Sequence, residues 1–163
     1  MPVRVRPRQV GDIGWACMRQ AELYAKEFRY TAVFEDYVIR SFAPFVEHLD
    51  PAKDGFWVAE LDGRRVGCIA IQHDAEKPGW AQLRWYFVES DARGHGVGRA
   101  LLDQALVFCH KAGYSGVWLW TVDDLAAARR QYEHSGFRLV HTEPHPCAWA
   151  PWGREQRWEL ALH

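Results

Sequence analysis

The sequence lacks several features that would define its class at once. No hydrophobic run approaches the ~20 residues of a membrane-spanning helix, and the first residues show no apolar signal-peptide core, so neither a membrane protein nor a secreted one is expected. An excess of one charge is also missing: 20 basic and 21 acidic side chains give a net charge of −1 and no electrostatic basis for binding nucleic acid. A hydrophobic fraction of 48% over 163 residues excludes a disordered chain.

Paired cysteines and metal-binding motifs are missing as well. The four cysteines are far apart, fall in apolar patterns and form no Cys-x-x-Cys motif: Cys17, Cys68, Cys109 and Cys147. Buried free thiols in a reducing compartment are therefore favoured over disulfides, and we expect a cytoplasmic protein. His141, His145 and Cys147 are close in sequence, but they lack the spacing of dependable zinc sites, so no metal is expected.

The length suits one domain covering residues 1–163. Before residue 55 the apolar residues follow a helical period. We expect one helix from a cap at Asp12 to Phe28, and a second from Phe34 to Leu49 that Pro44 kinks or splits.

After residue 55 the pattern changes to strands alternating with helices. Asp62-Gly63 predicts a hairpin turn, and Leu83, Trp85 and Phe87 alternate with polar neighbours. The predicted strands are 56–61, 65–72, 81–88, 116–121, 137–141 and 155–162. One helix is expected over 99–111, ended by Ala112-Gly113, and another from a cap at Asp123-Asp124 through Ser135. This order predicts an α/β fold with a mixed sheet.

A glycine-rich loop separates the strand ending at Val88 from the next helix: Arg93, Gly94, His95, Gly96, Val97, Gly98 and Arg99. Glycines allow close backbone approach, and the amides of a helix start favour phosphate oxygens. The loop lacks the Gly-Lys-Ser/Thr of a Walker motif and the spacing of a dinucleotide fingerprint. It fits an Arg-x-x-Gly-x-Gly pattern instead. From these residues alone, an anion site and an ordinary turn stay equally open.

A second motif makes the loop more specific. The segment 128–137 matches an Ala-x-x-x-Tyr-x-x-x-Gly-Phe signature, and with the glycine loop the chain resembles the GNAT superfamily of acetyl-CoA-dependent N-acetyltransferases. The resemblance implies a central mixed sheet of about six to seven strands, splayed to hold coenzyme A and flanked by about four helices. Segments 118–121, 143–145 and 158–160 resemble most closely GNAT domains fused to winged-helix (MarR-type) regulators.

The resemblance also implies roles for individual residues. Phe87 and Val88 would contact pantetheine through main-chain atoms. The amides from Gly94 to Arg99 would bind the pyrophosphate, with Arg93 supporting the loop. Tyr132 would act as the general acid that protonates the coenzyme A thiolate. Its spacing from Leu125 and Ala128 on one helix face leaves a core role open, and Leu125 stands where the family often has Asn.

The general base is less clear from the sequence. Gln82 stands where some family members have a glutamate, and Arg84 shares its face. Glu22, on the first helix, is the candidate base, and an ordered water is an alternative. Tyr24, Gln82, Arg84 and Trp149 are the candidate acceptor-binding residues. Residues 11–60 carry nine acidic and five basic side chains, which slightly favours a cationic acceptor.

Two functions remain open at this point. The first is an N-acetyltransferase that moves an acetyl group from acetyl-CoA to a primary amine by direct attack in a ternary complex. The amine would belong to a small molecule, a protein lysine or a protein N-terminus. The second is a catalytically weak acyl-CoA sensor, favoured by Gln82 in the place of a base. The loop 141–153, with three prolines and two tryptophans, would overhang the acceptor, pack on its own domain or form a homodimer contact.

Overall fold

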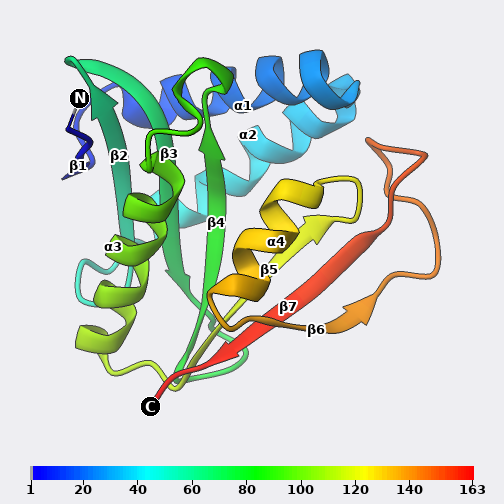
Figure 1. Cartoon of the computed structure of the whole chain (residues 1–163). Coiled ribbons are helices and arrows are strands. Elements are labelled where there is room, and N and C mark those ends of the chain that lie inside the picture. The colour runs from blue at the N-terminus through cyan, green and yellow to red at the C-terminus, as the bar shows by residue number, and fades with distance from the viewer. Residues whose placement is uncertain (1) are drawn as a thin grey trace.

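A computed structural model describes residues 2–163 as one mixed sheet with helices on both faces (Figure 1). The strands are β1 (Arg4–Pro7), β2 (Gly55–Leu61), β3 (Arg64–His73), β4 (Trp80–Val88), β5 (Gly116–Val122), β6 (Arg138–Thr142) and β7 (Glu155–Ala161). The helices are α1 (Asp12–Phe28), α2 (Ala32–Glu47), α3 (Val97–Ala112) and α4 (Ala126–His134), with a short 3-10 turn at Ser90–Ala92. The strand order is β1-β2-β3-β4-β5-β7-β6. The predicted mixed α/β fold is confirmed.

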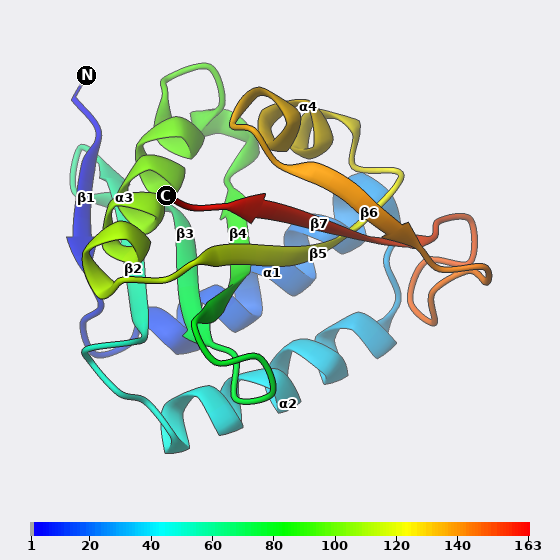
Figure 2. The same cartoon turned by 90° about the horizontal axis from the view of Figure 1, so that it is seen from below.

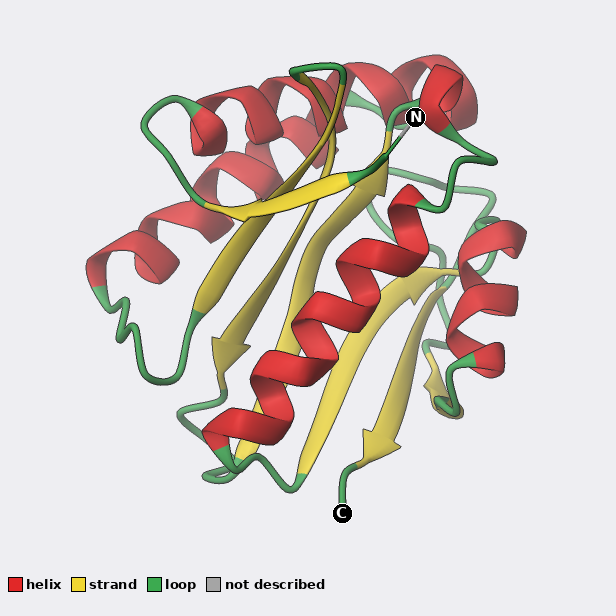
Figure 3. Ribbon diagram, turned by 60° about the vertical axis from the view of Figure 1, so that its left-hand side comes forward, coloured by secondary structure: helices red, strands yellow, loops and turns green. Residues whose placement is uncertain are grey.

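The sheet separates two hydrophobic cores. Helices α1 and α2 cover one face, and α3 and α4 cover the other (Figures 2 and 3). Ile69 and Ile71 of β3 pack toward α3, while Cys68 and Ala70 of the same strand pack toward α1 and α2. Side chains of a strand alternate between the two faces of the sheet. A strand that is covered on both faces therefore has apolar residues at successive positions of its sequence. None of the helices formed by residues 2–163 is long and apolar enough to cross a membrane.

Three local expectations are corrected. Pro44 does not split α2, because the proline lies in the last turn and Phe42 and Phe45 anchor both sides of it in the core. Asp12 does not cap α1: Gly11 does, with φ 93°. The strand β1 was not predicted from the sequence, because the alternation of Val3, Arg4, Val5 and Arg6 is too short to be distinctive.

The start of α4 is corrected too. It begins at Ala126 instead of following a cap at Asp123 or Asp124, and its N-cap residue is Leu125. The carboxylate of Asp123 accepts the Arg154 backbone N–H at 3.0 Å. The two carboxylate oxygens of Asp124 accept the Tyr30 hydroxyl and the Trp152 indole N–H. Tertiary partners thus occupy both side chains that the sequence assigned to capping.

A β-bulge in β4 changes which residues share a face. Cys68 pairs with Phe87 and Ala70 with Arg84, so Trp85 and Tyr86 together lie opposite one residue of β3. Trp85 has φ 48°, held by stacking on Phe42 at 3.9 Å. The apparent alternation of Leu83, Trp85 and Phe87 is therefore wrong as a single face: Leu83 packs toward α3, and the other two pack toward α1 and α2. Bulges of this kind are common beside functional sites.

A buried ion pair at the start of α1 gives the first prediction. Asp12 is fully buried; its carboxylate accepts Arg6 at 2.7 Å and 3.1 Å and lies 3.2 Å from Arg65. Burial alone would raise the pKa of Asp12, but the hydrogen bonds from Arg6 and Gln9 and the arginine charges outweigh it, so the pKa is lowered. We expect Asp12→Asn to lower the unfolding free energy by about 2–3 kcal/mol. This is near the lower end of the cost of breaking a buried ion pair, because Arg6 would still be paired with Glu60.

The pH dependence follows from the same shift. A carboxyl whose pKa is lowered in the folded state stabilises the protein above its unfolded pKa, and this stability is lost as pH falls through the folded pKa. Urea unfolding from neutral to acid pH checks both statements. The Asn variant should lose less stability on acidification than the wild type. Equal stability of the two proteins at neutral pH would show that the pair contributes nothing.

Candidate active site

The site lies where β4 and β5 separate. These two strands are parallel and pair over three residues only, Trp80, Ala81 and Gln82 with Gly116, Val117 and Trp118. Beyond Gln82 they diverge, and β7 follows β5 away from β4 (Figure 1). The result is a cleft of about 640 Å³ that passes between the two halves of the sheet. Both the α3–α4 side and the α1–α2 side of the sheet contribute lining residues.

The glycine loop reaches the α3–α4 side of this cleft. Gly94 and Gly96 adopt φ 83° and φ 78°, a region that L side chains rarely occupy, and Gly96 is the N-cap residue of α3. The first amides of a helix have no intrahelical acceptor, so the loop presents free N–H groups. Gly94, His95 and Gly96 are exposed, and Val97 and Gly98 line the cleft. The start of α3 can therefore bind an anion at the mouth of the cleft.

The two arginines of the loop have different surroundings. Arg93 donates to both carboxylate oxygens of Glu27 on α1, at 2.6 Å and 2.7 Å, and to the Val88 carbonyl at 3.3 Å. This bidentate pair ties the loop to α1. Arg99 is exposed and lies 3.5 Å from Asp103, one turn along α3. Only Arg93 touches the cleft.

Close packing also explains the third glycine of the loop. A Cβ atom at Gly98 would lie 2.8 Å from the Tyr86 hydroxyl and 3.2 Å from the Gln131 side chain. The Tyr86 hydroxyl donates to the Gly98 carbonyl at 2.7 Å. Gly98 thus lets β4, α3 and α4 meet closely where the loop enters the cleft.

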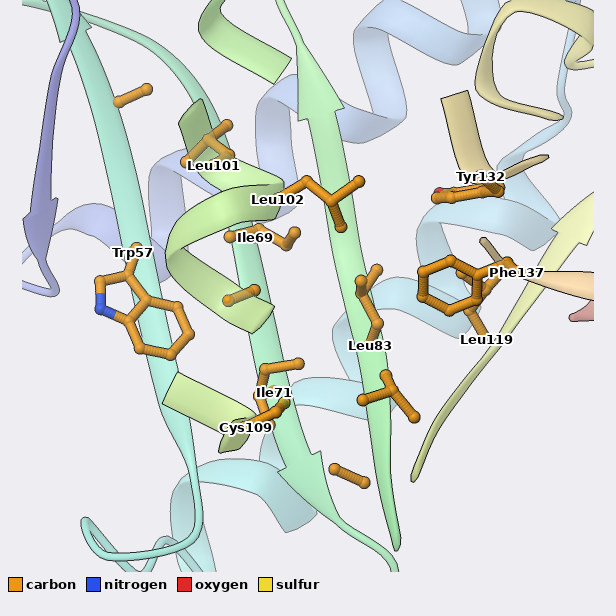
Figure 4. Packing of buried hydrophobic residues seen from close by; sticks show 14 of the residues in the cluster. Trp57, Ile69, Ile71, Leu83, Leu101, Leu102, Cys109, Leu119, Tyr132 and Phe137 are labelled. Carbon is orange, nitrogen blue, oxygen red and sulfur yellow. The ribbon is translucent and has the colours of Figure 1, made fainter. Parts of the chain in front are cut away.

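Tyr132 lies on α4 beside the cleft. Its ring is buried among Tyr86 and Phe137, with ring centroids 6.2 Å and 5.7 Å away, and it faces β4 across the cleft (Figure 4). Within residues 2–163 its hydroxyl makes no hydrogen bond to a protein group. Burial, with smaller contributions from Tyr86 and Tyr24, raises the pKa of Tyr132 well above its usual value. The phenol is therefore protonated at neutral pH and free to donate into the cleft.

The family is decided by a match over most of the chain. Residues 15–137 match the model of the acetyltransferase (GNAT) family. The chain belongs to this family. Enzymes of the GNAT family use acetyl-CoA and acetylate amine acceptors. The family predicted from the glycine loop and the Tyr132 segment is thus confirmed.

Individual relatives agree with this membership. N-acetylaspartate synthetase from Danio rerio is 38% identical over 93 residues, 57% of this chain and 33% of that protein. The chain spans 33%, 39% and 44% of the length of the curated relatives from Danio rerio, Methanocaldococcus jannaschii and Homo sapiens, and 73% of an uncharacterized N-acetyltransferase from Schizosaccharomyces pombe. A GNAT acetyltransferase structure from Staphylococcus aureus aligns with a TM-score of 0.76 and 19% identity, covering 99% of this chain and 100% of that one. The structure of an acetyltransferase from Bacillus anthracis, solved in complex with acetyl coenzyme A, aligns with a TM-score of 0.60 and 20% identity. The alignment covers 73% of this chain and 69% of that one.

The four candidate acceptor-binding residues of this GNAT chain meet in the cleft, whereas the candidate base does not. Tyr24, Gln82, Arg84 and Trp149 all line it, as do Phe87 and Val88. Glu22 does not: its side chain is 57% exposed and lies 3.6 Å from Arg19, on the outer face of α1. The structure does not bring Glu22 to the cleft, because α1 turns that position to solvent while Tyr24 turns inward.

The structure adds residues that the sequence did not single out. Tyr30, Phe34 and Tyr37 join Tyr24 and Trp149 in an aromatic wall, with Tyr37 and Trp149 centroids 4.8 Å apart. These aromatic residues come from separate segments of the chain, in α1, α2 and the loop 141–153, so no local sequence pattern predicts that they meet.

Glu155 is the carboxylate that the sequence reasoning missed. It is half-buried at the start of β7, lines the cleft and is paired in register with Val122. Burial, and to a smaller extent the charge of Glu143, raises its pKa above the usual value. Only the pairing of β7 with β5 brings this residue to the site. Within residues 2–163 no group of three or more His, Cys, Asp or Glu side chains is arranged to hold a metal.

Proposed function

We propose that this chain, as a single domain, transfers the acetyl group of acetyl-CoA to a primary amine by direct attack in a ternary complex. The amides from Gly94 to Arg99 bind the pyrophosphate, and the main chain at Phe87 and Val88 lies along pantetheine. The thioester then sits in the cleft, where Tyr132 donates a proton to the departing thiolate. The amine enters from the aromatic wall.

One observation carries this proposal: the cleft opens on both sides of the sheet. An anion-binding helix start lies on one side together with a protonated phenol, and an aromatic wall with a carboxylate lies on the other. Two reactants entering from opposite sides would meet at the gap between β4 and β5, which suits direct transfer.

An acyl-CoA sensor remains the alternative function, and the resemblance to regulator-fused domains supports it. Its main support was the absence of a base at Gln82. Glu155 weakens that support, because a half-buried carboxylate lines the acceptor side. A proton leaving the attacking nitrogen would pass to Glu155, directly or through water.

Substitution of Glu155 tests this role. We expect Glu155→Gln to lower kcat/KM at neutral pH by roughly 10- to 100-fold, at or below the usual range for a general base because water shares the task. A base acts when deprotonated, so wild-type kcat/KM should rise with pH through the raised pKa of Glu155. In the variant, the rise of kcat/KM that follows the titration of Glu155 should disappear, and the rise that follows deprotonation of the acceptor amine should stay. Glu133→Gln, on the solvent face of α4, is the control; equal pH profiles for both variants would exclude Glu155 as the base.

Calorimetric titration with acetyl-CoA, followed by a thiol-release screen across amines, tests the function itself. Aspartate belongs in the screen because relatives are named N-acetylaspartate synthetase. Binding with amine-dependent thiol release is the expected result. Binding without release for any amine would favour the sensor, and no binding would contradict both functions.

A further inference from the structure

Four charged side chains line the cleft, and within residues 2–163 only one of them, Arg93, has an ionic partner. Arg93 is neutralised by Glu27, and Asp124 accepts hydrogen bonds from Tyr30 and Trp152. Arg84 and Glu155 form no ion pair with any other side chain in the part of the chain described, residues 2–163. A partly buried cation and a partly buried carboxylate without ionic partners in one cleft are available to pair with the charges of a ligand.

Arg84 is held in place by neutral groups. Its guanidinium donates to the Gln72 amide oxygen at 3.1 Å and to the Tyr37 hydroxyl at 2.9 Å, and it lies 4.6 Å from the Trp85 ring centroid. These contacts fix the orientation of the guanidinium and leave its charge uncompensated. Two of its five N–H groups are used, so others remain for a ligand. A fixed guanidinium of this kind suits a carboxylate, which it can bind through two parallel hydrogen bonds.

Arg84 and Glu155 lie at different depths of the cleft. Arg84 is two residues beyond Gln82, the last β4 residue that pairs with β5, so it lies near the vertex. Glu155 pairs with Val122, the last residue of β5, so it lies toward the wide end. An ammonium group would be repelled by Arg84 and attracted by Glu155. A ligand with opposite charges at its two ends matches this arrangement.

We propose that the acceptor is a small amino acid, a primary amine that also bears a carboxylate, and that Arg84 binds the carboxylate. This inference rests on the proposed function and names its substrate class. The amine then faces Glu155 and the thioester. A cleft of about 640 Å³ has the size of a single small-molecule pocket, and the coenzyme arm must share it.

The experiment compares matched acceptors by thiol release. L-amino acids are tested beside the amines left when the α-carboxylate is removed, and beside short peptides with the same first residue. In the wild type, kcat/KM for the preferred amino acid should exceed that of its matched amine by roughly 10- to 100-fold, the effect of one charged hydrogen-bonded contact. Arg84→Gln should abolish this ratio by lowering kcat/KM for the amino acid, while kcat/KM for the decarboxylated amine should not fall, because the variant removes a charge that repels ammonium.

Two further variants keep the result interpretable. Arg84→Lys keeps the charge without the planar fork and should retain part of the ratio. Arg40→Gln removes an exposed arginine of α2 and should retain all of it. Release without preference for amino acids, an unchanged ratio in Arg84→Gln, or preference for the peptides would each overturn this inference and leave acetyl transfer standing. No release with any amine would defeat the proposed function and this inference with it.

Discussion

Replacing Tyr132 by Phe should lower kcat by roughly 100- to 10,000-fold, the usual contribution of a positioned general acid. The thiolate of coenzyme A would leave without a proton donor, while the coenzyme would still bind through the α3 amides. The Tyr132 hydroxyl makes no hydrogen bond to a protein group in residues 2–163, so its loss should leave the unfolding free energy nearly unchanged. Thiol release under saturating acetyl-CoA measures the effect, and calorimetry measures the acetyl-CoA Kd in parallel.

A matched control separates catalysis from packing. Tyr114→Phe removes a hydroxyl that donates to the Lys53 carbonyl outside the cleft, and this variant should keep wild-type kcat. If Tyr132→Phe also kept wild-type kcat, the residue would be only a core side chain that shares a helix face with Ala128. A fall in both kcat and acetyl-CoA affinity would instead indicate a distorted cleft.

Gly96→Asp should weaken acetyl-CoA binding by roughly 100- to 1,000-fold, because a carboxylate would stand where the pyrophosphate is expected and like charges in contact cost several kcal/mol. The position accepts a side chain: a Cβ atom there meets nothing within 4 Å. Asp tolerates positive φ better than most residues and is a favoured helix N-cap, so folding should survive.

The uncharged partner variant isolates the electrostatic effect. Gly96→Asn has nearly the same shape, the same tolerance of φ 78° and no charge, so its acetyl-CoA Kd should stay much nearer the wild type. The difference between the two variants should shrink as salt is added, since the loop is exposed and its charges are screened. Equal binding by Asp and Asn variants would contradict the assignment of the pyrophosphate to this helix start.

Local chemistry explains why the turn and helix start around the glycine loop were predictable. The glycines at 94 and 96 encode positive φ angles that few other residues accept, and they directly precede a helix whose amphipathic period is clear. Strand, turn and helix are consecutive in the chain, so their geometry depends on near neighbours. Tyr132 was singled out because residues 128–137, in α4 and just beyond it, resemble a motif of the family.

The acceptor half depended on contacts between distant segments. Glu22 and Tyr24 are two residues apart on α1, yet only the packing of α1 on the sheet decides which one faces the cleft. Glu155 reaches the site because β7 is inserted between β5 and β6, an order that no local pattern encodes. The bulge at Trp85 interrupts an alternation that looks regular in sequence, because the extra residue appears only when β3 is aligned beside β4.

The sequence by itself thus determined the mixed α/β fold and the sharp glycine turn before α3, because these rest on periodicity and on backbone angles that particular residues impose. Its two motifs also carried the resemblance that predicted the family. The tertiary structure alone decided the separation of β4 from β5 and the absence of an ionic partner for Arg84 and Glu155. It also decided the ion pair of Asp12 and the hydrogen bonds of Asp124, which occupy these two side chains. Burial and charge pairing are properties of residues brought together from distant parts of the chain, and a linear pattern does not contain them.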